Sequence, residues 1–437
     1  MGGFHSLRAL HPFGPASRVA ATSSGIYSAT PTTIHARHSS GTNVAWTSKK
    51  KSQPGFVERG RRAMRKGGDL KPIKLGQIEL ENTNGPPNLP TISKLEVGPL
   101  LRNSAIAFSS GEKSISKVFG LPLAVYKDSR LLSQPFSVIR GVTLRSYGWM
   151  DKASKTPSRD TRIVLAGIPG CGKSVTLLQM VEYCASKGWI VFYVPRASNW
   201  VNSSSAYQYD AQSRIFQQPT LAKWALKRLS AFNESKLNSV TTSEDFRHEK
   251  KTIVSGSSIL SLIALGIQDP SAAPRVLEFT LAELQKMNTP VLVAIDDFQA
   301  LYQRSLYKDP LFNNIPSHAL SMPRLMLEYA SGVRSFRRGA VVGSLCMTNT
   351  DFHIPYELRD ALGLTPDFSL HHMGARNQAY VDFSKGLQAA AMTEVWEHGR
   401  ALHSKLTESL FLAKLAESSG NPREFLHRGL WSSVVTW

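Results

Sequence analysis

The chain has 437 residues, 42% of them hydrophobic, which is enough for two or three domains with a sizeable core. Its 52 Lys and Arg against 32 Asp and Glu give a formal charge of +20, which favours a polyanionic partner, nucleic acid ahead of an anionic membrane. Cys171, Cys184 and Cys346 stand apart, which excludes a disulfide framework or a Cys/His zinc site. The longest apolar runs fall short of the ~20 residues that a spanning helix needs, so no membrane span is expected.

The amino-terminal segment has the composition of a targeting signal. The first acidic residue is Glu58, and the residues before it carry arginines and lysines among many Ser, Thr and Ala. This composition is typical of a mitochondrial transit peptide, and it lacks the continuous apolar core of a secretory signal. We therefore expect residues 1–45 to be a transit peptide and the protein to reach the mitochondrial matrix. The alternative is a disordered tail without a targeting role.

Residues 46–96 are predicted to form a basic flexible arm. The stretch 49–74 holds ten basic residues against two acidic ones, and it is too rich in Gly, Pro and charge to fold alone. A solvated tail is one interpretation, and contact with RNA phosphates is the other. The candidate RNA-binding residues are Lys49, Lys50, Lys51, Arg59, Arg61, Arg62, Arg65 and Lys66.

Apolar runs that resemble strands alternate with helical stretches through the centre of the chain. This alternation predicts an α/β fold, in which a parallel sheet is covered by helices on both faces. We expect this domain to span residues 97–355 and a C-terminal helical, lid-like region to span 356–437. The predicted strands are 161–167, 189–195, 291–296 and 339–347, and the predicted helices are 177–188, 221–232, 322–335, 386–406 and 408–420.

A phosphate-binding motif lies between the first predicted strand and the following helix. Gly167, Gly172, Lys173 and Ser174 satisfy the P-loop pattern G-x-x-x-x-G-K-[ST], which predicts a P-loop NTPase fold of the AAA+/STAND-like type. We expect the loop's backbone N–H groups and the helix dipole to hold phosphates, Lys173 to bridge the β- and γ-phosphates, and the Ser174 hydroxyl to ligate Mg²⁺. The nucleotide-binding residues predicted from this motif are Gly167, Ile168, Pro169, Gly170, Cys171, Gly172, Lys173, Ser174 and Val175.

Two aspartates, Asp296 and Asp297, lie at the end of the third predicted strand. The run 291–296 ends in Asp296, whose carboxylate is predicted to lie on the metal side, so Ser174 and Asp296 are the expected metal ligands. Asp297 stands where hydrolysing members of the additional-strand ATPase class typically carry a Glu that activates water. Because the aspartate side chain is one methylene shorter, Asp297 is a candidate general base for slow turnover at most.

Two further residues are candidates for contact with the nucleotide. Asn349 and its neighbour Thr348 follow the fourth predicted strand, where the same class carries a polar residue that faces the γ-phosphate. A turn that ends the strand is the alternative. Arg423 begins a helix after a Gly-Asn-Pro turn and resembles the second sensor arginine of this class, with a plain surface arginine as the alternative.

Five stretches, in their order and spacing, resemble a family of mitochondrial small-subunit ribosomal proteins also called death-associated protein three, in its fungal-type version. They are GIPGCGKS, ASKGWIVFYVPRASNWV, FQQPTLAKW, VLVAIDDFQALYQRS and SGNPREF, and the resemblance runs from about Phe119 to Arg428. It implies a P-loop protein of the head of the mitochondrial small ribosomal subunit. It also implies contacts with small-subunit ribosomal RNA, with neighbouring mitoribosomal proteins and, through inter-subunit bridges, with the large subunit. The resemblance leaves the role of residues 203–254 open.

The resemblance also implies a bound purine nucleotide, GTP or ATP or the corresponding diphosphate, with Mg²⁺. The sequence carries no base-recognition motif and leaves adenine and guanine open. We expect a structural ribosomal component that the nucleotide stabilises, with at most slow hydrolysis and no enzymatic role. The alternative is an active mitochondrial AAA+/STAND-type ATPase or GTPase that acts as a switch.

Overall fold

The computed structural model of the protein describes residues 89–92, 101–123, 125–126, 136–249, 251–364, 377–392, 408–419 and 421–425. All of them belong to the unit Asn82–Trp437. The predicted transit peptide and the eight candidate RNA-binding residues of the arm lie outside the described residues, in the unit Met1–Glu81.

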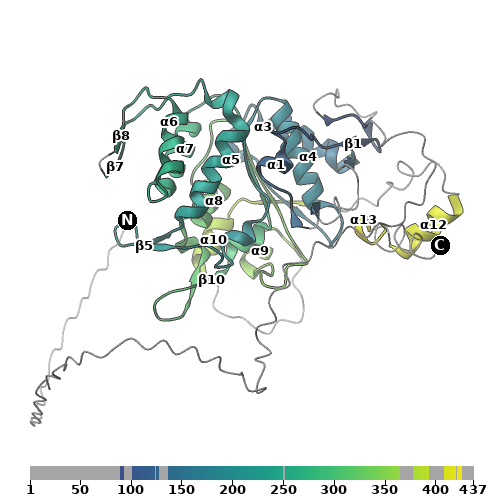
Figure 1. Ribbon diagram of the computed structural model, residues 1–437. Coiled ribbons are helices and arrows are strands. Elements are labelled where there is room, and N and C mark those ends of the chain that lie inside the picture. The colour runs from purple at the N-terminus through teal and green to yellow at the C-terminus, as the bar shows by residue number, and fades with distance from the viewer. Residues whose placement is uncertain are drawn as a thin grey trace, which may run out of the picture. The chain divides into compact units, whose positions relative to one another are not determined.

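A five-stranded parallel sheet forms the centre of the unit (Figure 1). Along β3, Ile163 and Leu165 join the hydrophobic cluster on one face, while Val164 and Ala166 join the cluster on the other. Burial on both faces explains why the central strands read as continuous apolar runs. In spatial order the strands are β13 (Gln388–Ala391), β3 (Arg162–Ala166), β12 (Gly339–Ser344), β9 (Val291–Asp296) and β4 (Ile190–Val194).

Helices cover both faces of the sheet, as the alternating pattern predicts (Figure 1). The helix α3 (Gly141–Ala153) and the helix α4 (Lys173–Ser186) contribute to one buried cluster. The helices that contribute most to the other cluster are α5 (Pro219–Leu237), α6 (Ile259–Gln268), α7 (Ala273–Gln285) and α8 (Ser321–Ala330). None of the helices in the described part of the chain combines the length and the apolar character needed to cross a membrane.

The helix α5 (Pro219–Leu237) protects the outer edge of the sheet at β4. Asn233 is fully buried, accepts a hydrogen bond from the backbone N–H of Val191 at 2.8 Å, and donates one to its carbonyl at 2.9 Å. The side-chain amide therefore satisfies the backbone N–H and C=O of Val191, which the edge strand leaves without a strand partner. Phe232 of the same helix packs against the cluster of α3 and α4, so α5 bridges the two faces at this edge.

The strand β13 corrects one expectation for the C-terminal part of the chain. The stretch 386–406 was predicted to be helical, but Gln388–Ala391 pairs in parallel with β3. Alanine and glutamine favour helices, and tertiary pairing overrides that preference here. Leu358 of α9 (Tyr356–Ala361) and Tyr380 of α10 (Gln378–Ser384) are buried in the cluster of α6 to α8. Residues 356–364 and 377–392 therefore pack with the α/β core, and the C-terminal region 356–437 as a separate region stays a prediction.

The remaining described elements surround this centre. Ile92, which was predicted to lie in the arm, is 2% exposed and packs in the cluster of α3 and α4, so the folded unit begins before residue 97. The predicted helix 408–420 is confirmed as α12 (Glu408–Glu417). The other elements are α1 (Ile115–Val118), α13 (Pro422–Glu424), and the strand pairs β1 (Ala105–Ala107) with β2 (Phe136–Val138), β5 (Gln208–Asp210) with β6 (Ile215–Gln217), β7 (Phe246–His248) with β8 (Lys251–Ile253), and β10 (Arg304–Lys308) with β11 (Asn314–Pro316).

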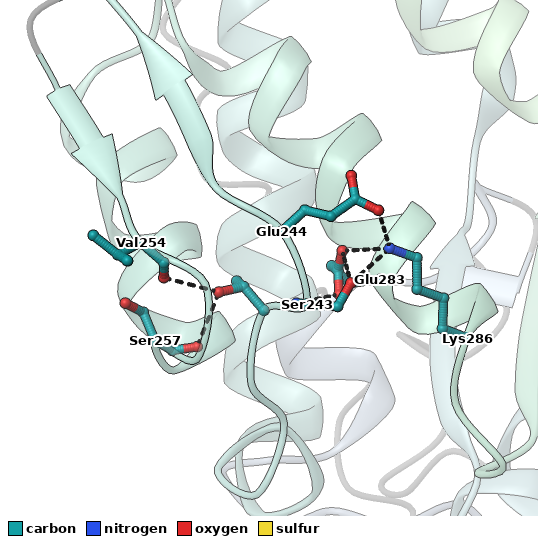
Figure 2. Close-up of polar contacts among 7 residues, drawn as sticks. Ser243, Glu244, Val254, Ser257, Glu283 and Lys286 are labelled. Carbon is teal, nitrogen blue, oxygen red and sulfur yellow. Dashed lines mark hydrogen bonds and ion pairs between the residues drawn. The ribbon is translucent and has the colours of Figure 1, made fainter.

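The segment that carries β7 and β8 is fastened to α7 by a polar cluster (Figure 2). The Glu283 carboxylate of α7 accepts hydrogen bonds from the backbone N–H of Ser243 at 2.8 Å and from its hydroxyl at 3.0 Å. The Lys286 ammonium contacts Glu283 at 3.0 Å and Glu244 at 2.7 Å. Only 4% of the Glu283 side chain is exposed, so this buried carboxylate depends on its partners.

The tip between β10 and β11 presents two large apolar side chains to solvent. Leu311 is 80% exposed and Phe312 is 82% exposed. Phe312 has a φ of 61°, in the left-handed region that a bulky residue rarely adopts. The Asp309 carboxylate accepts hydrogen bonds from the backbone N–H groups of Leu311 and Asn313, at 2.9 and 2.8 Å. The tip is therefore ordered by its own hydrogen bonds in spite of the strained residue.

Candidate functional site

The glycine-rich loop, residues 167–174, joins β3 to α4 at the carboxyl end of the sheet. Gly167, Gly170 and Gly172 have φ values of 152°, 79° and 88°, which side chains with a Cβ rarely adopt. The helix α4 begins at Lys173, so its first turn borders the loop. The strand, loop and helix that the sequence predicts are all present in this order.

Lys173 is held inside this loop. Its ammonium donates hydrogen bonds to the carbonyls of Gly167 and Ile168, each at 2.8 Å, and the residue is 6% exposed. Burial lowers the pKa of Lys173, and the nearby Cys171 sulfur and Asp296 carboxylate oppose that shift. The partners of the enclosed ammonium are thus two carbonyl oxygens and, at 3.7 Å, the Cys171 sulfur.

The two predicted metal ligands meet at the carboxyl ends of the strands. The Ser174 hydroxyl donates to Asp296 Oδ1 at 3.0 Å, across 122 residues of sequence. Asp296 ends β9 and is 3% exposed. Burial, and secondly the Asp297 carboxylate, raise the pKa of Asp296. The Ser174 hydroxyl and the Asp296 carboxylate supply oxygen atoms, which are the ligands that Mg²⁺ prefers. The carboxylate is buried, and a bound cation would favour its ionised form.

Asp297, the candidate base, is positioned by a residue that the sequence did not indicate. It has a φ of 57°, and one carboxylate oxygen accepts a hydrogen bond from the Ser198 hydroxyl at 2.6 Å. Ser198 lies in the turn Ala197–Trp200 that follows β4. The carboxylate is therefore fixed in direction by a neighbouring strand end, and the role of Asp297 as a base stays a prediction.

Asn349 caps the turn after β12. Its side-chain oxygen accepts hydrogen bonds from the backbone N–H groups of Asp351 and Phe352, at 3.0 and 3.2 Å. The oxygen therefore stabilises the turn, which was the alternative interpretation of this position. The predicted contact between Asn349 and a γ-phosphate stays a prediction.

The segment that contains Arg423 reaches the glycine-rich loop through Asn421. The Asn421 side-chain nitrogen donates to the Pro169 carbonyl at 2.6 Å, and its oxygen accepts from the backbone N–H of Arg423 at 3.0 Å. A Cβ on Gly170 would lie 2.3 Å from the Asn421 oxygen, so glycine is required at this contact. The sequence predicted a role for Arg423 of the motif SGNPREF, whereas Asn421 of the same motif makes the contact with the loop.

Arg140 also contacts the loop, although no sequence pattern indicated it. It follows β2, is 8% exposed, and donates to the Cys171 carbonyl at 2.8 Å and to the Thr176 hydroxyl at 2.8 Å. Its sequence neighbourhood offers only short apolar pieces, so no local motif indicates this role. Among the remaining predicted residues, Ile168 is 62% exposed at the rim, and Val175 packs against the cluster of α3 and α4.

Within the described residues, no group of three or more His, Cys, Asp and Glu side chains is arranged to hold a metal ion. The metal prediction therefore depends on Ser174 and Asp296. A cavity of about 210 Å³ lies elsewhere, near the amino ends of β3 and β13, lined by residues such as Trp149, Thr161 and Gln388. This cavity takes no part in the loop site.

These observations define an α/β protein with a five-stranded parallel sheet and a glycine-rich loop whose lysine, serine and acidic partner converge. Residues 137–428 match the model of the family described as mitochondrial ribosomal death-associated protein 3, and the chain belongs to this family. The predicted family is thereby confirmed, and membership of a mitochondrial ribosomal family agrees with the predicted location.

Curated relatives give the same result. The chain is 32% identical over 214 residues to the small ribosomal subunit protein mS29 of Schizosaccharomyces pombe, covering 47% of this chain and 44% of the relative. It is 27% identical over 233 residues to mS29 of Neurospora crassa, covering 52% and 49%. It is 25% identical over 250 residues to mS29 of Mus musculus, covering 55% and 63%. The chain spans about half the length of the curated relatives it matches.

Proposed function

We propose that the protein is a structural component of the mitochondrial small ribosomal subunit and that it holds a purine nucleotide with Mg²⁺ in its glycine-rich loop. The observation that carries the first part is the family match over residues 137–428, together with the relatives named as small-subunit ribosomal proteins. The formal charge of +20 supports a partner with a phosphate backbone, such as the small-subunit ribosomal RNA. Neighbouring ribosomal proteins and the large subunit complete the proposed set of partners.

The second part is supported by the loop. Three glycines with positive φ, a buried lysine and the start of α4 are the features with which P-loops bind phosphate. The strand β12 lies between β3, which leads into the loop, and β9, which ends in Asp296, as expected for an additional-strand P-loop protein. A bound Mg²⁺ would supply the positive charge that the buried Asp296 lacks, and Ser174 and Asp296 are its proposed protein ligands.

In this proposal each residue has a defined task. Lys173 neutralises phosphate charge by exchanging its two carbonyl partners for phosphate oxygens. The loop and the carboxyl ends of β3 and β9 orient the nucleotide, and burial of Lys173 and Asp296 strengthens their electrostatic contribution. Asp297 is tied to Ser198, which supports a nucleotide that is held with little turnover. The base preference, adenine or guanine, is left open.

The test compares Lys173→Ala with Asp297→Asn. Removing the lysine should release the nucleotide and with it the stability that a bound ligand provides, about 2.7 kcal/mol for a ligand at 100 times its dissociation constant. Asp297→Asn keeps the size of the side chain and should leave nucleotide content, melting temperature and mitochondrial translation nearly unchanged. The measurements are nucleotide content by chromatography of denatured, purified subunits and a translation assay.

The controls separate the parts of the proposal. Lys155→Ala removes an exposed lysine away from the loop and should retain the nucleotide. Sucrose-gradient sedimentation of mitochondrial extract tests whether the chain travels with the small subunit. If Asp297→Asn retains the nucleotide but abolishes translation, hydrolysis is required, and the alternative of an active ATPase or GTPase switch replaces the structural role.

A further inference from the structure

The guanidinium of Arg140 holds the glycine-rich loop from the side of α3. Arg140 is 8% exposed and occupies the N-cap position of that helix. One terminal nitrogen donates to the Cys171 carbonyl at 2.8 Å, and the other contacts the Gly172 carbonyl at 3.5 Å and donates to the Thr176 hydroxyl at 2.8 Å. The Cys171 carbonyl is thus turned towards this buried cation, while the Gly172 carbonyl accepts the helical hydrogen bond from Thr176 N–H at 2.9 Å.

The direction of the Cys171 carbonyl fixes the direction of the neighbouring N–H group. In a planar trans peptide the C=O and N–H bonds point to opposite sides. When the Cys171 carbonyl faces Arg140, the N–H of Gly172 must face away from it. This amide belongs to the segment that a P-loop uses to cradle phosphate.

Gly172 allows the guanidinium to approach this closely. A Cβ at position 172 would lie 2.8 Å from the Arg140 Nη2 atom, and the φ of 88° already disfavours other residues. Gly172 therefore leaves room for the Arg140 guanidinium, and it also adopts the left-handed backbone conformation of the loop.

A buried hydrogen-bond network holds Arg140 in place. Its backbone N–H donates to the Thr143 hydroxyl at 3.2 Å, and that hydroxyl donates to the Gln179 side chain of α4 at 2.8 Å. Gln179 in turn donates to the Ser137 hydroxyl at 2.7 Å and to the Val138 carbonyl at 3.0 Å. The corner between β2 and α3 is therefore fastened to the helix that the loop precedes.

We infer that Arg140 is a positioning residue of the nucleotide site, which it serves by holding the Cys171 carbonyl so that the amide of Gly172 faces the phosphates. This inference rests on the proposed nucleotide binding. The guanidinium also adds a second fixed positive charge beside Lys173, which favours a phosphate ligand.

The test uses the purified full chain and titrates fluorescent GTP and ATP analogues in Mg²⁺. Arg140→Gln removes the charged hydrogen bonds and should weaken nucleotide binding about 10- to 100-fold, in line with the contribution of such bonds. Arg140→Lys keeps the charge but not the planar fork and should recover part of the affinity. Melting temperatures without nucleotide are measured in parallel.

Arg337→Gln is the matched control. It makes the same change at an exposed arginine that precedes β12, at the amino end of the parallel sheet and away from the loop, so it should leave the affinity within about twofold. Equal affinity of wild type and Arg140→Gln, or of wild type and a folded Arg140→Lys if the glutamine variant does not fold, overturns the inference. So does an equal loss of affinity in Arg337→Gln. If the wild type binds neither analogue, the proposed function fails first and the inference with it.

Discussion

Phe312 illustrates how a single residue can be strained without being buried. Its ring is 82% exposed, and its φ of 61° costs roughly 1–2 kcal/mol for a residue with a Cβ. Asparagine tolerates this conformation better. We expect Phe312→Asn to raise the free energy of unfolding by about 0.5–1 kcal/mol, because it relieves strain and removes little packing. Urea denaturation of the purified chain measures the change.

Leu311→Asn provides the control for this prediction. Leu311 is similarly exposed at 80% and is not among the residues with positive φ. Replacing it should leave the unfolding free energy within about 0.5 kcal/mol of wild type. An equal gain from both substitutions would show that removing an exposed apolar side chain, and not the relief of backbone strain, is responsible.

Some residues of the site can be recognised from the sequence and others cannot. Lys173, Ser174 and Asp296 were predicted because a local motif or a strand end marks each of them, and the structure brings the serine and the aspartate within 3.0 Å. Arg140 and Asn421 contact the loop across 31 and 252 residues. No local pattern indicates such contacts, because they arise only when separate elements pack together.

At the scale of the elements, the polar cluster of Figure 2 attaches the β7–β8 segment to α7 through Ser243, Glu244, Glu283 and Lys286, and the stability of this attachment depends on pH. Burial acts to raise the pKa of Glu283, but hydrogen bonds from Ser243 and Lys286 outweigh it and lower the pKa below the ordinary glutamate value of about 4.3. A lowered carboxyl pKa stabilises the folded state above that ordinary value. The stabilisation is lost as the pH falls through the lowered folded-state pKa.

Glu283→Gln should therefore lower the free energy of unfolding by about 1–3 kcal/mol at neutral pH, since it removes the charge that its partners compensate. The difference from wild type should shrink as the pH falls below about 4. Urea unfolding at several pH values measures it. The control is Glu244→Gln, which removes an ion pair with the same lysine from a side chain that is 68% exposed, and it should change stability by less than about 1 kcal/mol. A pH-independent effect of Glu283→Gln would contradict the assigned cause.

The sheet shows what apolar patterning can and cannot predict. The strands β3, β4, β9 and β12 were predicted because strands buried on both faces give continuous apolar runs. The strand β13 was missed because its sequence, QAAA, favours a helix and only its pairing with β3 makes it a strand. The hairpins β5–β6 and β7–β8 were not predicted either, since their three-residue strands carry too little periodicity to be recognised.

For the whole molecule, the charge of the arm gives a prediction about assembly. Arg59, Arg61, Arg62 and Arg65 lie outside the described residues. Replacing all four with Gln should reduce the salt dependence of binding to ribosomal RNA, by about 0.7–0.9 in slope for each arginine that neutralises a phosphate. A filter-binding titration over a range of salt concentrations measures this slope.

The charge-matched control replaces four exposed basic residues of the folded unit, Lys155, Arg159, Arg337 and Arg338, with Gln. Both variants carry the same reduced charge, so a smaller slope in the arm variant alone assigns the phosphate contacts to the arm. An unchanged slope in the arm variant would identify the arm as a solvated tail.

The order of strands in the sheet also sets the order of events during folding. The strands β3 and β9 are not paired with each other, and both pair with β12, which comes last of the three in the chain. A growing chain that ends before Gly339 therefore has no strand to join the half that carries Ser174 to the half that carries Asp296. Non-local parallel pairing of this kind is slow. The proposed nucleotide needs both residues, so it would stabilise only a chain in which these strands are already paired. It would therefore act late in folding and would not nucleate the fold.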